Sequence, residues 1–66
     1  MKVIIEFDTD NEAFEEPNFA METRAVLTQA ERFLAHGSNA LARVGADLIL
    51  RDSNGNTIGT VEMMKS

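Results

Sequence analysis

Two short acidic segments come nearest to a known chemistry, that of a calcium loop. They begin at Asp8 and Asp52, and each places oxygen-bearing side chains at alternate positions. A calcium loop of the helix–loop–helix type needs glycine at its sixth position and a bidentate glutamate at its twelfth. The first segment has Ala13 and Phe19 there, and the second has Thr57 at the sixth position and no glutamate at the twelfth. We therefore predict turns at both segments, and no metal site.

The chain offers little from which an enzyme active site could be built. His36 is the only histidine, there is no cysteine, and the four glycines match no phosphate-binding fingerprint. A catalytic imidazole needs a nucleophile to activate and a carboxylate to orient it, held together in a pocket. A chain of 66 residues leaves little room for such a pocket. We predict that the protein is not an enzyme and uses no cofactor, and that His36 lies near the end of a helix.

The charge is unevenly distributed along the chain. The net charge is −5, and seven of the eleven acidic residues fall between positions 6 and 22 without a basic residue among them. The six lysines and arginines are scattered singly, unlike the basic patch that binds a phosphate backbone. We predict no direct nucleic-acid binding and expect a partner protein with a basic surface, unless the acids only maintain solubility. The predicted partner-binding carboxylates are Asp8, Asp10, Glu12, Glu15 and Glu16.

Alternating apolar and polar residues predict the first element. Val3, Ile5 and Phe7 alternate with charged residues, which is the pattern of a half-buried strand, although Ile4 adds an apolar side chain to its polar face. Residues 9–18 are rich in Asp, Asn and Glu and contain the only proline, so they predict a loop. We expect Phe14 and Phe19 to pack this loop against the core.

A helix is predicted from about residue 19 to residue 36, because the apolar period changes there to 3.6. Asn18 is expected to cap its start, and Gly37 to supply the left-handed residue that ends it. The predicted core stripe consists of Thr23, Val26, Leu27, Ala30, Phe33 and Leu34. The predicted solvent face consists of Glu22, Arg24, Thr28, Gln29, Glu31 and Arg32.

Residues 48–50 and 57–64 are predicted as two strands joined by a turn over residues 52–56. Asn54-Gly55 between apolar runs is a strong hairpin signal, because both residues tolerate a positive φ. The segment 38–46 is small and mixed, and Leu41 and Val44 are expected to cover exposed sheet. The whole chain, residues 1–66, is therefore predicted as a single α+β domain of order β-α-β-β. One amphipathic helix packs on a small three-stranded, mainly antiparallel sheet.

One helix can cover only one face of such a sheet. The residues expected to face the helix are Val3, Ile5, Phe7, Leu48 and Leu50. Ile4 and Ile49 are expected to point away from it and to contribute to the partner-binding surface. Depending on register, they are joined by Ile58, Val61, Met63 or Met64. An exposed apolar face of this kind predicts a homodimer, unless Leu41 and Val44 fold over it.

The expected location is the cytoplasm. The absence of cysteine fits a reducing compartment. No segment approaches the roughly 18 apolar residues of a membrane span, and the N-terminus turns acidic too soon for a secretory signal. We therefore expect no membrane partner.

Two motifs resemble those of a group of short proteins from tailed phages and prophages. The first runs from Glu6 to Phe14 and begins Glu-Phe-Asp-Thr-Asp-Asn; the second is the hairpin Leu-Arg-Asp-Ser-Asn-Gly-Asn-Thr-Ile-Gly from Leu50 to Gly59. The resemblance implies a phage accessory protein in the host cytoplasm. Small acidic proteins of this type often inhibit host defence, as anti-CRISPR proteins do. The alternatives are a homo-oligomeric structural or regulatory accessory protein, or a small-nucleotide sequestering protein that uses Arg24, Arg32, Arg43 or Arg51.

Overall fold

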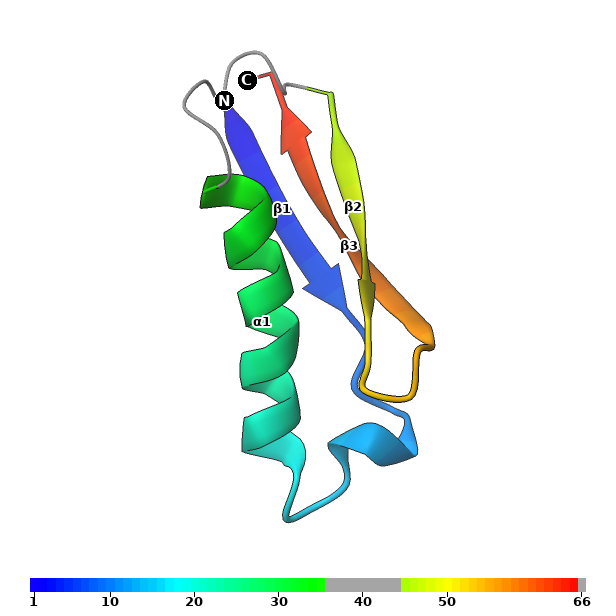
Figure 1. Cartoon of the computed structure of the whole chain (residues 1–66). Coiled ribbons are helices and arrows are strands. Elements are labelled where there is room, and N and C mark those ends of the chain that lie inside the picture. The colour runs from blue at the N-terminus through cyan, green and yellow to red at the C-terminus, as the bar shows by residue number, and fades with distance from the viewer. Residues whose placement is uncertain (36–44, 66) are drawn as a thin grey trace.

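The computed structural model describes residues 1–35 and 45–65, and it confirms the predicted fold class (Figure 1). One helix packs on one face of a three-stranded antiparallel sheet. The elements are β1 (Lys2–Phe7), the 3₁₀ turn η1 (Glu12–Phe14), α1 (Phe19–Ala35), β2 (Asp47–Arg51) and β3 (Thr57–Met64). The predictions for His36, Gly37, Leu41, Arg43 and Val44 lie outside the described residues.

The strand order is β1-β3-β2, so the C-terminal strand lies in the middle and both other strands are edges. Ile5 and Leu48 both lie opposite Val61, which places all three side chains on the same face of the sheet. This face packs against α1 and η1. Its fully buried side chains are Leu50 and Val61, together with Val26 of the helix. The core therefore sits between α1 and the strands β2 and β3.

The outer face of the sheet, which faces away from α1, carries Ile4, Ile49 and Met64, one of the combinations that the prediction left open. Ile4 lies opposite Glu62, and Ile49 lies opposite Thr60, so polar side chains of β3 separate the two isoleucines. Ile58 does not join them: the register shifts between Leu50 and Arg51, and Ile58 packs against the core instead. Val61 and Met63 are also buried on the helix side, which leaves Met64 as the apolar outer-face residue of β3.

The helix is rotated relative to the predicted stripe. Val26 and Ala30 are buried as expected, but Leu27 is 44% exposed, so its prediction as core is wrong. Glu22 and Gln29 were predicted to face solvent and instead contact the sheet side of the molecule. The reason is that α1 packs toward β2, which turns the flank bearing Glu22 and Gln29 inward and the flank bearing Leu27 outward.

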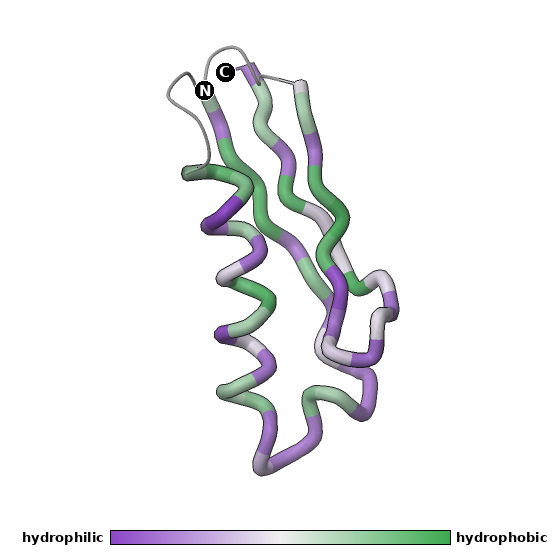
Figure 2. Tube along the Cα trace, in the orientation of Figure 1, coloured by the Kyte–Doolittle hydropathy of each residue, from purple (hydrophilic) through white to green (hydrophobic). Residues whose placement is uncertain are grey.

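β1 receives less cover from the helix than the other strands. Val3 and Ile5 lie on the helix side of the sheet, yet they are 42% and 41% exposed. In Figure 2 the middle of β1 is an apolar stretch that lies between two hydrophilic positions. Only Phe7, at the end of the strand, packs against the core cluster, where its ring stacks on Phe14 at a centroid distance of 6.2 Å. Phe14 is buried as predicted, and Phe19, although 42% exposed, meets the Phe14 ring edge-on at a centroid distance of 5.9 Å.

Candidate functional site

The turn between β2 and β3 is organised around the buried carboxylate of Asp52. Oδ1 accepts hydrogen bonds from the backbone N–H groups of Asn54 and Asn56, both at 2.9 Å, and Oδ2 accepts one from the Asn56 side chain at 3.2 Å. Gly55 has a φ of +85°, which confirms the prediction from the Asn-Gly pair. The oxygens that a metal ion would need are already used by donors of the turn. The segment is therefore built as a turn.

These hydrogen bonds determine how Asp52 responds to pH. Burial alone would raise the pKa of its carboxyl, but the hydrogen bonds from Asn56, Asn54 and Gly55 outweigh burial and lower the pKa below its ordinary value. A carboxyl with a lower pKa in the folded state stabilises the fold above its unfolded pKa of about 3.9. That contribution is lost as the pH falls through the folded pKa.

Acidification is therefore expected to lower the free energy of unfolding below about pH 4, and Asp52→Asn should weaken this dependence. Urea denaturation at neutral pH and at about pH 3 measures it. Asp10→Asn is the matched control, because Asp10 is an exposed aspartate. Identical pH dependence of Asp52→Asn and the unmodified protein would show that the Asp52 hydrogen bonds do not set the acid response.

Two side chains of α1 tie the helix to β2 and its turn. The Glu22 carboxylate is buried and accepts a hydrogen bond from the Ser53 N–H at 2.6 Å. The Gln29 amide accepts from the Arg51 N–H at 3.0 Å and donates to the Arg51 carbonyl at 2.6 Å. Sequence reasoning missed both roles, because a polar residue beside an apolar stripe is normally solvent-facing. No signal in the sequence marks these two apart from the other polar residues of the helix.

The acidic segment between β1 and α1 is held by its own side chains. Asp8 Oδ1 accepts from the Asp10 N–H at 2.9 Å, and Asn11 Oδ1 accepts from the Ala13 N–H at 3.0 Å, where it caps η1. Phe14 then anchors the segment in the core. The carboxylates of this segment are therefore presented from an ordered backbone.

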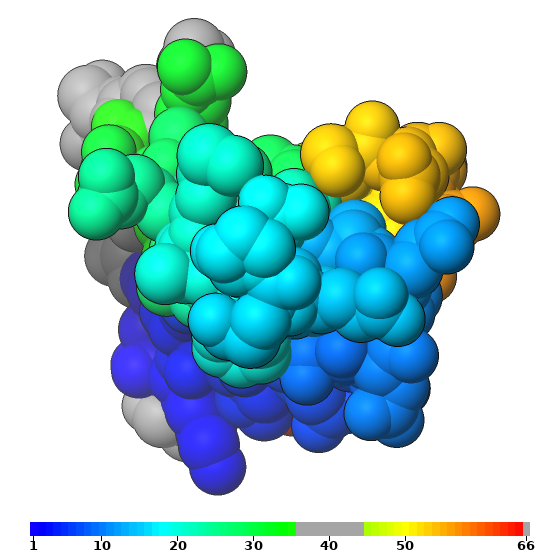
Figure 3. All heavy atoms as spheres, turned by 90° about the horizontal axis from the view of Figure 1, so that it is seen from below, coloured from blue at the N-terminus to red at the C-terminus, as the bar shows by residue number. Residues whose placement is uncertain are grey.

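The five carboxylates predicted as a partner-binding surface gather at one end of the molecule, which we call the acidic end. It consists of Asp8, Asp10, Glu12, Glu15 and Glu16, all of them exposed. Figure 3 looks onto this end and shows residues 8–18 beside the β2–β3 turn. Within residues 1–35 and 45–65, none of the five forms an ion pair. Their charges therefore face solvent without local compensation.

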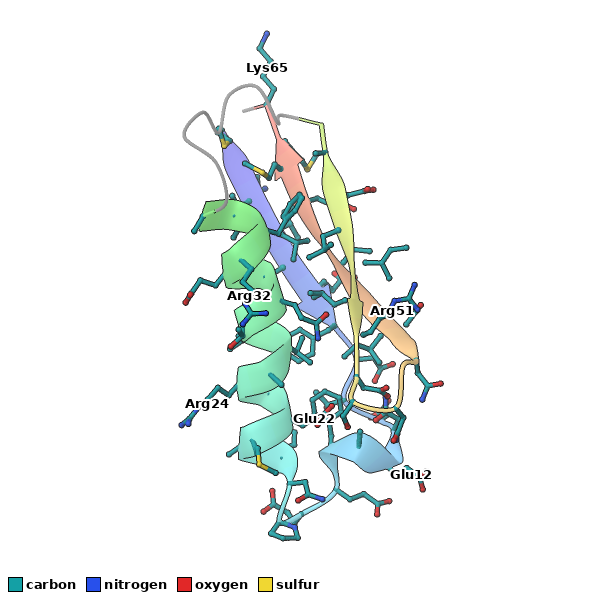
Figure 4. The ribbon with its side chains drawn as sticks, viewed as in Figure 1. Glu12, Glu22, Arg24, Arg32, Arg51 and Lys65 are labelled. Atoms are coloured by element: carbon teal, nitrogen blue, oxygen red, sulfur yellow. The ribbon has the colours of Figure 1, made fainter. Side chains whose placement is uncertain are left out.

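A shallow groove crosses the acidic end between η1, the start of α1 and the β2–β3 turn. It contains three glutamates and one strongly exposed apolar side chain, Met21. Figure 4 shows Glu22 reaching from α1 toward the turn and Glu12 on η1 nearby. The groove is lined by Glu12, Ala13, Glu15, Asn18, Met21, Glu22, Ala25, Ser53 and Asn54. Such a lining suits a long basic side chain, whose apolar stem could rest on Met21.

The two isoleucines predicted to join this surface lie elsewhere. Ile4 is half-buried in the middle of β1, and Ile49 is 50% exposed in the middle of β2. Both lie on the outer face of the sheet, on opposite sides of β3. The structure thus brings together the carboxylates but does not bring Ile4 and Ile49 next to one another.

The three arginines that the structure describes do not converge on one site (Figure 4). Arg24 and Arg32 project from α1, whereas Figure 4 shows Arg51 beside β2 and β3, on the side of the strands away from α1. The Arg51 guanidinium donates to the Gly55 carbonyl at 3.3 Å and to Thr57 Oγ1 at 3.5 Å. Phosphate groups need several donors that meet at one point. These three described arginines provide no such point.

Comparison with known protein families, with curated proteins and with solved structures finds no match to the chain. Among residues 1–35 and 45–65, no group of three or more His, Cys, Asp or Glu side chains is arranged to hold a metal ion. In the same part of the chain, no helix has the length and apolar character needed to cross a bilayer. The acidic end is thus the candidate site that the geometry of the described residues supports best.

Proposed function

We propose that the protein is a non-catalytic binding protein whose acidic end docks on a basic surface of another protein. The observation that carries this proposal is the gathering, at one end of the fold, of five exposed carboxylates that form no ion pair with any described residue. Charges of one sign on one surface attract an oppositely charged partner over about a Debye length, roughly 8–10 Å at physiological salt. They raise the association rate and favour one orientation of approach.

The ordered backbone of the acidic segment adds to this proposal. The side chains of Asp8 and Asn11 hold the turn, and Phe14 anchors it, so the segment loses little conformational freedom on binding. The groove beside it offers a place for a basic side chain of the partner, with Met21 as an apolar contact. Lysine and arginine bury an apolar stem and keep a charged head, which matches this mixed lining.

The partner that we propose is a component of a bacterial defence system, so that the protein acts as an inhibitor in the manner of anti-CRISPR proteins. This part of the proposal is supported by the resemblance of the Glu6–Phe14 and Leu50–Gly59 motifs to short phage proteins. A defence protein that normally holds nucleic acid has a basic surface of the required kind. An acidic end that covers such a surface would keep nucleic acid away from it.

Neutralising the acidic end is expected to abolish partner binding while the fold remains intact. The variant carries Asp8→Asn, Asp10→Asn, Glu12→Gln, Glu15→Gln and Glu16→Gln. Asparagine at position 8 keeps an oxygen that can accept the Asp10 N–H. Binding to a partner captured from bacterial lysate is measured at low and high salt, and circular dichroism reports the fold. For the unmodified protein, the association rate should fall steeply as salt rises.

The control separates a local effect from a loss of net charge. Glu12→Gln/Glu15→Gln/Glu16→Gln removes three charges from the acidic end, and Glu31→Gln/Asp47→Asn/Glu62→Gln removes three from other parts of the surface. Only the first triple variant should weaken binding strongly. Equal binding by both triple variants, with no dependence on salt, would eliminate the acidic end as the binding surface.

A further inference from the structure

The outer edge of β1 carries backbone groups that no other described strand pairs with. β1 is an edge strand, hydrogen-bonded to β3 on one side only. The Asp8 N–H donates to the Ile58 carbonyl at 2.9 Å, so the groups of Ile4 and Glu6 also point toward β3, because the direction alternates along an antiparallel strand. The N–H and C=O groups of Val3 and Ile5 then point outward. They present two donors and two acceptors in the geometry that another strand would use.

The two edges of the sheet differ. On the β2 edge, the Gln29 amide both donates to and accepts from the backbone of Arg51, so a side chain takes the place of a neighbouring strand there. Both edge strands hold three successive apolar residues, Val3 to Ile5 and Leu48 to Leu50, but among the described residues no side chain bonds to the outward backbone groups of Val3 and Ile5. Natural proteins usually protect an edge of that kind. β1 is therefore the edge that is suited to strand pairing.

The helix flank above β1 is apolar and exposed as well. In a helix of 3.6 residues per turn, Gln29 and Leu27 project about 160° apart. Gln29 reaches β2, so Leu27 lies on the flank toward β1, where it is 44% exposed beside a groove that Phe19 and Thr23 also line. Val3, Ile5 and Leu27 are thus exposed apolar side chains on the helix side of the molecule. A second chain that pairs with β1 would cover Val3 and Ile5.

The order of residues along β1 identifies the second chain. We propose that β1 pairs antiparallel with β1 of another copy, about a two-fold axis at Ile4. This register places Lys2 opposite Glu6 of the partner copy at both ends, and Val3 opposite Ile5 on the helix side. Ile4 then meets its own equivalent on the outer face. Opposite charges that face one another stabilise a strand pair, whereas a parallel pairing in register would set like charges together.

The same register satisfies the backbone. Val3 and Ile5 are the residues whose N–H and C=O groups point outward, and this register makes them hydrogen-bonded partners of one another. Ile4, Lys2 and Glu6 fall at the non-hydrogen-bonded positions, where opposing side chains are closest. The two-fold axis runs perpendicular to the joined sheet, so both helices lie on the same face. The Leu27 side chains of the two copies then flank a shared strip of Val3 and Ile5.

A charge-reversal cycle tests this dimer by sedimentation over a range of concentrations. The unmodified protein should sediment at twice the 7.3 kDa of one chain when concentrated. Lys2→Glu or Glu6→Lys alone sets like charges opposite one another at both ends, and should raise the dimer dissociation constant about tenfold or more. The double variant Lys2→Glu/Glu6→Lys restores opposite charges and should return the constant to within about threefold of its original value. Within one chain, Lys2 and Glu6 lie opposite the uncharged Met64 and Thr60, so the reversals leave the fold intact.

Hydrogen exchange of single amides provides a second readout. The Val3 and Ile5 amides should exchange rapidly in the dilute monomer and become protected in the dimer, whereas the Ile4 amide is bonded to β3 in both states.

Ile49→Ala, on the outer face of β2, is the control and should leave dimerisation unchanged. A 7.3 kDa species at every concentration would overturn the proposal. So would a dimer that tolerates both single charge reversals or that dissociates on Ile49→Ala. The test does not involve the acidic end, so its failure leaves the proposed function standing.

Discussion

Replacing Gly59 with alanine is expected to unfold most of the protein. Gly59 lies in β3 directly opposite Phe7, where the two strands approach closely. A Cβ added at position 59 would overlap the Glu6 carbonyl oxygen and would lie 2.5 Å from Phe7 Cα and 2.6 Å from Phe7 Cβ. Backbone atoms cannot rotate away as a flexible side chain can, so β1 would have to shift relative to β3. We expect a cost of about 3 kcal/mol or more, against a total stability of roughly 3–5 kcal/mol for so small a domain.

Gly55→Ala is the matched control for this experiment. Position 55 has a positive φ, but a Cβ there would meet nothing within 4 Å. The substitution therefore costs only the backbone preference, about 1–2 kcal/mol. Urea denaturation followed by circular dichroism compares the two variants. An unfolding midpoint for Gly59→Ala at or above that of Gly55→Ala would show that β1 and β3 do not approach as closely at this point as the structure has them.

Leu50→Ala is expected to cause the second large loss of stability. Leu50 is fully buried in β2 and packs in the same cluster as Val26 and Val61. Truncation removes the transfer free energy of the lost methyl groups and leaves a cavity in a small core that has few ways to collapse. The expected cost is about 2–5 kcal/mol.

The neighbouring residue provides the control, because Ile49 belongs to the same strand but points to the outer face and is half exposed. Ile49→Ala should change the free energy of unfolding by less than about 1 kcal/mol. Chemical denaturation of the two variants at low protein concentration makes the comparison. Equal losses for Leu50→Ala and Ile49→Ala would mean that the two faces of β2 have been assigned the wrong way round.

The sequence predicted the bounds of the helix and strands better than their strand order, register and packing. The helix begins at Phe19 as predicted and β3 spans Thr57–Met64 as predicted, because local periodicity and turn residues set these limits. The strand order and the rotation of α1 depend on contacts between distant segments, which periodicity does not encode. Leu27 therefore appeared to belong to the core, and Gln29 to the solvent face. The register shift that turns Ile58 inward is likewise a tertiary feature, without a signal in the β3 sequence.

The sequence also predicted only part of the arrangement of the candidate site, because it encodes local structure better than contacts between distant segments. The five carboxylates of the acidic end lie within nine successive positions, so any compact arrangement of that loop gathers them. Ile4 and Ile49 are far apart in the sequence, and their proximity depended on a strand order that the sequence left open. The structure places β3 between them, with Thr60 and Glu62 opposite the two isoleucines. A surface formed by residues close together in the sequence was thus predictable. A surface formed by residues of two separate strands was not.

The hydrogen bonds of Gln29 also bear on how far the sheet can extend. A side-chain amide has the donor and acceptor of a peptide group, and at Arg51 it occupies the place of a fourth strand. A further chain that paired with β2 as far as Arg51 would have to break both bonds, and it would meet the charge of Asp47 at the start of that strand. Pairing through β1 would then stop at two copies, because the β1 edge of each copy is occupied by β1 of the other. The proposed pairing would therefore give a closed assembly with two-fold symmetry instead of an open-ended fibre.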